Sequence, residues 1–139
     1  MRAARGGRRP ADTLTRVSPV PAVDDVLDPS VATLTLPAAG RLLGVPQSRV
    51  TQHVRDDDLL AIRRDRAVVV PEIFLDGESR RVLKGLPGTI KVLLDGGWTR
   101  EEVLRWLFTP DESLPGSPVD ALRGDRGKEI TRRAQALAF

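Results

Sequence analysis

LTLPAAGRLLGVPQSRVTQHVRDD, residues 34 to 57, combines two short helical patterns separated by a glycine. In the first pattern, apolar residues recur at helical spacing: Ala39, Leu42 and Leu43. Pro37 suits the start of this helix, because the N–H that proline lacks has no partner in a first helical turn. Gly44 has the permissive backbone on which helices commonly end, and a second helix is expected from about Pro46. The stretch therefore predicts two helices joined by a tight turn.

The second helix has one apolar side, formed by Val50 and Val54, which lie close together at about 100° per residue. Its other positions present polar groups to solvent or to the flank: Gln47, Ser48, Arg49, Thr51, Gln52 and Arg55. Arginine can bind guanine edges or phosphates, and glutamine can bind adenine edges, as reading a DNA major groove requires. A solvated helix face has the same composition, so the neighbouring elements must decide between the two interpretations.

Residues 59 to 75, LLAIRRDRAVVVPEIFL, contain two β-rich runs separated by a short polar turn at Asp65 and Arg66. Pro71 is expected to close the second strand. Helix, tight turn, helix and hairpin follow in the order of a winged helix-turn-helix, in which the second helix enters the major groove. Three arginines lie at or beside the tip of this wing, where they could reach a phosphate or the minor groove: Arg63, Arg64 and Arg66.

Three acids, Asp56 to Asp58, directly follow the second helix. Both the helix dipole and nearby phosphates disfavour negative charge at this position. Either the DNA contacts stop before Asp56, or binding is weak. A neutral interpretation, in which the acids only solvate a turn, is preferred to a metal site.

The chain of 139 residues has the length of about one ordinary domain. Residues 1 to 33 contain few clustered apolar residues, which predicts a flexible tail. Residues 34 to 76 form the predicted winged helix-turn-helix domain, and residues 77 to 139 a C-terminal helical domain. Within the latter, Thr99 and Glu102 have capping-box spacing, and the last helix has an apolar stripe of Ile130, Ala134 and Leu137. The expected fold class is mainly α with a small β-hairpin wing.

The composition argues against several classes of function. Cysteine is absent and His53 is the only histidine, so neither a metal cluster nor a His-based catalytic pair is expected. There is also no nucleotide-binding glycine loop, nucleophile elbow or acid pair, and we expect neither an enzyme nor a cofactor. A formal charge of +3 and a pI near 10.1 permit anionic partners. No apolar run approaches the roughly 18 residues that cross a bilayer, and a cytoplasmic protein is expected.

Two groups of C-terminal residues have a structural and a nucleic-acid interpretation. Trp98, Trp106 and Phe108 could stack on bases, although their helical setting favours a place in the core. A basic cluster could bind phosphates or form a solvated helix face: Arg123, Arg126, Lys128, Arg132 and Arg133.

Residues 34 to 75 resemble the excisionase and MerR-type winged helix-turn-helix. The matching positions are Leu34, Thr35, Ala39, Leu43, Gly44, Val45, Val50, Leu59, Ala61 and Arg63. The whole chain further resembles an actinobacterial and mycobacterial family of small DNA-binding proteins. That likeness is carried by DDVLDP (24 to 29), LPG (86 to 88), DGGW (95 to 98), RWLFTPD (105 to 111), PVDAL (118 to 122) and RRAQALAF (132 to 139).

The family resemblance implies a winged helix-turn-helix that binds double-stranded DNA, a C-terminal helical domain particular to the family, and an N-terminal tail phosphorylated by a Ser/Thr protein kinase. Thr13 matches the phosphorylated position, and Thr15 is a second candidate. We therefore expect a DNA-binding regulator of transcription. The alternative is a protein-interaction adaptor whose helix-turn-helix no longer binds DNA. The oligomeric state is left open.

Overall fold

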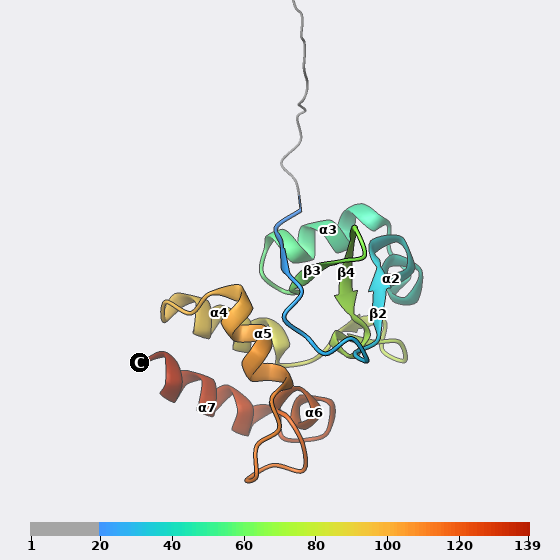
Figure 1. Cartoon of the computed structure of the whole chain (residues 1–139). Coiled ribbons are helices and arrows are strands. Elements are labelled where there is room, and N and C mark those ends of the chain that lie inside the picture. The colour runs from blue at the N-terminus through green and yellow to red at the C-terminus, as the bar shows by residue number, and fades with distance from the viewer. Residues whose placement is uncertain (1–19) are drawn as a thin grey trace, which may run out of the picture.

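The computed structural model describes residues 20 to 139, and Thr13 and Thr15 lie outside the described residues. Figure 1 shows two packed layers, with a small sheet and two helices above and four helices below. The expected class, mainly α with a small β-hairpin wing and C-terminal helices, is confirmed. None of the described helices is long and apolar enough to cross a membrane.

The helix-turn-helix consists of α2 (Leu36–Leu43) and α3 (Gln47–Arg55). Thr35 caps α2, because its hydroxyl accepts a hydrogen bond from the backbone N–H of Ala38. Gly44 ends α2 in the left-handed conformation, with φ of 72°, as the glycine at this position predicts. Helix α3 begins within a residue of the expected start at Pro46, so the local signals placed both helices correctly.

The wing is a hairpin of β3 (Ala61–Arg64) and β4 (Ala67–Pro71), in the register Arg64 opposite Ala67. Asp65 and Arg66 form the two-residue turn and both have positive φ, 52° and 65°. This is the backbone of the turn types that match the twist of a β-hairpin, although Asp-Arg is not a favoured sequence for it. The predicted turn and the predicted end at Pro71 are confirmed.

The expected tail of residues 1 to 33 is too long, because residues 20 to 33 belong to the folded part of the chain. Strand β1 (Ala22–Asp24) pairs in parallel with β3, and β2 (Thr33–Thr35) pairs antiparallel with β4. The sheet order is β1-β3-β4-β2. A three-residue strand has no pattern of its own, and β1 pairs with residues about 40 positions away, so local reasoning did not find it.

The wing continues into a short 3-10 helix, η1 (Glu72–Phe74), and a second hairpin of β5 (Leu75–Asp76) and β6 (Arg81–Val82). Four helices follow: α4 (Leu86–Asp95), α5 (Arg100–Phe108), α6 (Pro118–Arg123) and α7 (Gly127–Ala138). The capping box at the start of α5 is complete, as its spacing predicts. Helix α6 does not follow from the sequence pattern, because its six residues are too few to show a helical period.

One continuous core joins the winged helix-turn-helix to the C-terminal helices. Phe74 is fully buried, and the centroid of its ring lies 5.7 Å from the ring centroid of Phe108, with the two rings tilted. Trp98 and Trp106 are half-buried against the same core and meet edge to face. The core interpretation of these aromatic residues therefore agrees with the structure.

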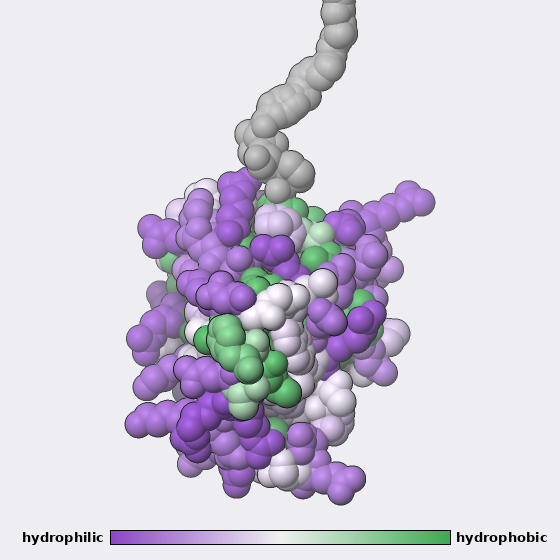
Figure 2. Space-filling model, turned by 90° about the vertical axis from the view of Figure 1, so that its left-hand side faces the viewer, coloured by the Kyte–Doolittle hydropathy of each residue, from purple (hydrophilic) through white to green (hydrophobic). Residues whose placement is uncertain are grey.

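The apolar stripe of α7 is shorter than expected. Ile130 and Ala134 are buried, whereas Leu137 is 49% exposed and Phe139 is 87% exposed. Leu137 lies in the last turn of α7 and Phe139 directly follows the helix. The C-terminus is at the left in Figure 1, and Figure 2 shows a hydrophobic patch on that side of the molecule. The expectation that Leu137 is buried is wrong: in the last turn of α7 the residue that packs against the end of α4 is Ala138, close to Gly96.

Candidate nucleic-acid interface

Helix α3 presents a polar face to solvent over a buried apolar one. Val50 and Val54 are fully buried under α3, which fixes its rotation. The residues expected at a DNA groove are exposed, except for the half-buried Thr51: Gln47, Ser48, Arg49, Gln52 and Arg55. At about 100° per residue, Ser48, Gln52 and Arg55 point away from the core and Arg49 lies on one flank.

The turn between α2 and α3 depends on a close backbone approach at Gly40. A Cβ at this position would lie 2.8 Å from the carbonyl oxygen of Val45, closer than real Cβ contacts. Gly40 therefore lets the backbone of the turn pack directly on α2.

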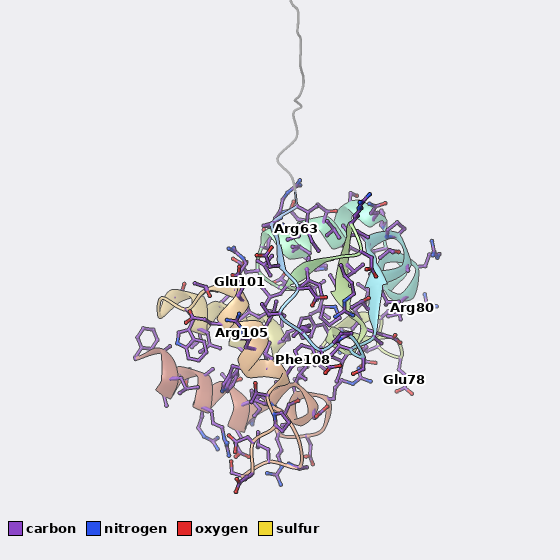
Figure 3. All side chains as sticks on the ribbon, viewed as in Figure 1. Arg63, Glu78, Arg80, Glu101, Arg105 and Phe108 are labelled. Carbon is purple, nitrogen blue, oxygen red and sulfur yellow. The ribbon has the colours of Figure 1, made fainter. Side chains whose placement is uncertain are left out.

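The three wing arginines have different environments. Arg66 is exposed at the tip of the hairpin and makes no ion pair with residues 20 to 139. Arg63 is 54% exposed and donates to the carbonyl of Ala22 and to Asp24, with 3.0 Å to the Asp24 carboxylate. Figure 3 shows Arg63 beside the start of the folded chain. Of the three, only Arg66 is thus exposed without using its guanidinium inside the described part of the protein.

Arg64 is held inside the fold. Its guanidinium donates to the Asp25 carboxylate at 2.6 Å and to the carbonyls of Val31 and Asp28, and its side chain is only 15% exposed. The hydrogen bonds from Arg64 lower the pKa of Asp25 below its usual range. Arg64 was expected on a DNA backbone, but this geometry gives it a structural role, because every nitrogen of its guanidinium already has an acceptor.

The acids after α3 connect the two parts of the molecule, and the interpretation that they only solvate a turn is wrong. Asp57 has a left-handed backbone with φ of 60° and accepts two hydrogen bonds from Arg100 at the start of α5. Asp58 accepts from Lys91 of α4 at 2.8 Å and lies 3.0 Å from the ring of His53. Burial raises the pKa of Asp58, but the hydrogen bonds with Lys91 and His53 outweigh it, and the pKa lies below its usual range.

Asp56 is the C-cap of α3, and its side chain bonds within the helix-turn-helix. Its carboxylate accepts a hydrogen bond from the side-chain amide of Gln52 at 2.9 Å. Gln52 therefore keeps its amide carbonyl for another partner while its NH₂ group is held in place. The described residues contain no group of three or more His, Asp or Glu side chains that could hold a metal ion.

The residues of the basic C-terminal cluster differ in their contacts. Arg123 donates to the carbonyl of Leu75, and Arg126 and Arg133 both pair with Glu129. Lys128 and Arg132 are on α7 and both are exposed. Helix α7 lies at the opposite end of the molecule from α3 (Figure 1), so these residues form no common surface with the recognition face.

The order of elements, the buried side of α3 and the exposed wing define a winged helix-turn-helix protein. Two family models match the chain: "DNA-binding protein Rv2175c, wHTH domain" over residues 19 to 75, and "Rv2175c C-terminal domain of unknown function" over residues 83 to 138. The chain belongs to the Rv2175c family.

A relative and a solved structure, both named Rv2175c, match over nearly the full length. The chain is 48% identical to the DNA-binding protein Rv2175c of Mycobacterium tuberculosis over 145 residues, which covers 96% of this chain and 99% of the relative. It also resembles the NMR structure of Rv2175c, with a TM-score of 0.77 and 46% identity over 97% of this chain and 100% of that one. The resemblance to a small mycobacterial DNA-binding family is therefore confirmed.

Proposed function

We propose that this protein binds double-stranded DNA by inserting α3 into the major groove, and that it regulates transcription. The observation that supports this most directly is the exposed polar face of α3 above two buried valines. The relative from M. tuberculosis is named a DNA-binding protein, which agrees with the proposal. Arg49, Gln52 and Arg55 read or position the groove, and Arg66 at the wing tip contacts the flanking backbone.

Replacing Arg49 by alanine is expected to weaken binding to duplex DNA by about 1–3 kcal/mol and to make binding less dependent on salt. Arg49 is exposed on α3 and makes no hydrogen bond or ion pair through its side chain with residues 20 to 139, so the substitution disturbs the fold little. Fluorescence anisotropy titrations between roughly 50 and 200 mM salt, the range over which phosphate contacts weaken steeply, give both quantities.

Lys128→Ala is the matched control, because Lys128 is an exposed cation on α7, far from α3 (Figure 1). It removes the same charge and should change affinity much less. Binding with no salt dependence would exclude the proposed phosphate contacts. If the full-length protein binds no duplex, the proposal of DNA binding is wrong. The protein would then be an adaptor that recruits another protein.

We propose further that phosphorylation of Thr13 by a Ser/Thr kinase lowers DNA affinity, with Thr15 as a second acceptor. Four arginines precede Thr13 in the sequence: Arg2, Arg5, Arg8 and Arg9. A phosphate adds about −1.5 to −2 charge and would offset their attraction to DNA.

Thr13→Glu is accordingly expected to reduce affinity for duplex at low salt, with a smaller difference at high salt, where such attraction is screened. The same titration on Thr13→Ala controls for loss of the hydroxyl. Identical curves for the glutamate variant, the alanine variant and the natural sequence would show that charge at this position does not affect binding.

A further inference from the structure

A groove of about 360 Å³ runs along the flank of α3 that carries Arg49 and His53. Arg80 and Arg81, from the β5–β6 hairpin, also line it. Asp58 is the acid among its lining residues. The groove thus joins the proposed recognition helix to an element that follows the wing in sequence.

The groove concentrates positive charge without a free counter-ion. Arg49, Arg80 and Arg81 are all exposed, and their side chains make no hydrogen bond or ion pair within the part of the chain that the structure describes. Asp58 is already bound to Lys91 and to His53. Three arginines around one groove repel each other, and an anion between them would relieve that repulsion.

The backbone of Arg80 is held in an uncommon conformation, and its side chain lies over the helix-turn-helix. Its φ is 55°, in the left-handed region that non-glycine residues rarely adopt. The side chain reaches the turn between α2 and α3: a Cβ added to Gly44 would be 3.2 Å from Nη1 of Arg80. The missing side chain of Gly44 therefore leaves space for the guanidinium.

Arg80 lies apart from Arg63, the wing arginine that is labelled in Figure 3. In Figure 3, Arg63 of β3 and Arg80 are on opposite sides of β4 and β2. Basic groups near the recognition helix thus come from two separate elements, Arg66 at the tip of the wing and Arg80 and Arg81 in the β5–β6 hairpin. This arrangement suits the two DNA backbones that border a major groove.

We infer that the β5–β6 hairpin is a second backbone-binding arm, in which Arg80 and Arg81 bind a DNA phosphate beside the groove that α3 enters. This rests on the proposed function of α3. Arginine is suited to the task because its planar guanidinium can donate two parallel hydrogen bonds to a phosphate. The contact carries no base information, so it strengthens binding to all sequences alike.

The double variant Arg80→Ala, Arg81→Ala tests the arm. Its affinity for duplex should fall at least about tenfold at physiological salt, and the salt slope should decrease by about 1 for each phosphate that is no longer bound. The reduction should be equal for a preferred and a scrambled duplex. Arg80→Lys, Arg81→Lys keeps the charge and should retain most of the salt slope. In a phosphate-ethylation interference experiment, ethylation of the phosphates bound by the arm should weaken binding of the natural protein and should not affect binding of the alanine variant.

The matched control is Lys128→Ala, Arg132→Ala, which removes two charges from α7 at the other end of the molecule. Circular dichroism melting curves of all variants establish that the fold is retained. An unchanged salt slope and ethylation pattern for the Arg80 and Arg81 variant, with Arg49→Ala still weakened, would overturn the arm alone. A natural protein that binds no duplex would overturn the proposed function itself. An equal reduction in both double variants would show a general charge effect and would also overturn the arm.

Discussion

Replacing Phe74 by alanine is expected to lower the free energy of unfolding by about 3–5 kcal/mol, the usual effect of removing a large aromatic residue from a core. Phe74 is fully buried, and its ring packs against Phe108 of α5, with 5.7 Å between the ring centroids. It lies in η1, at the junction between the wing and the C-terminal helices. The cavity would therefore open where the two parts of the core meet.

Stabilities of natural domains are about 5–15 kcal/mol, so this single change removes a large share of the total. Guanidinium chloride unfolding followed by tryptophan fluorescence measures it, since Trp98 and Trp106 lie in the C-terminal part of the same core. Phe139→Ala is the matched control: it removes the same ring from a position that is 87% exposed and should change stability by under about 0.5 kcal/mol. Equal effects of the two substitutions would contradict a shared core around Phe74.

Arg64→Ala is expected to destabilise the fold by about 2–3 kcal/mol, because Asp25 and the carbonyls of Val31 and Asp28 together lose a charged donor. The segment that these bonds hold contains the connection between β1 and β2. The matched control is its neighbour Arg63, which is 54% exposed against 15% for Arg64. Arg63→Ala should cost less than about 1 kcal/mol, as for an exposed ion pair.

The contribution of Arg64 should also depend on pH. Because the folded pKa of Asp25 is lowered, the stabilisation is fully present above the unfolded pKa of about 3.9 and is lost as pH falls through the lower folded pKa. The stability difference between the natural protein and Arg64→Ala should therefore shrink in acid below about pH 4. A constant difference down to about pH 2 would exclude the ion pair as its main source.

The same variants separate a structural arginine from a DNA contact. Arg66→Ala should reduce the salt slope of DNA binding by about 1, whereas Arg64→Ala, compared where it is still folded, should leave it unchanged. If Arg64→Ala lowered the slope as much as Arg66→Ala, Arg64 would bind the DNA backbone, as its position beside the wing tip first suggests.

Local signals in the sequence determined most of the winged helix-turn-helix. Pro37 and Gly44 marked the ends of α2, and the valines four positions apart gave the buried side of α3. Each of these signals acts within one or two turns of helix or across one hairpin, so spacing alone is enough to recognise it. The spacing of about 100° per residue also predicted the exposed face of α3.

Tertiary structure decided what the charged residues do. Arg64 meets Asp25 across 39 positions, and Asp57 meets Arg100 across 43, so no local pattern could pair them. The acids after α3 are unfavourable for DNA binding by their position in the sequence, yet they dock the C-terminal helices. Likewise, Arg80 and Arg49 are far apart in the sequence and share one groove only because the β5–β6 hairpin folds back beside α3.

The sequence by itself thus determined the helices, the wing and the polar face of α3, because hydrophobic spacing and helix caps are short-range. Only the tertiary structure decided which arginines remain available to DNA, because an ion pair forms wherever the folded chain brings opposite charges together. Of the wing arginines, Arg66 at the tip is the one that remains available to DNA. On the flank of α3, Arg80 and Arg81 are available together with Arg49.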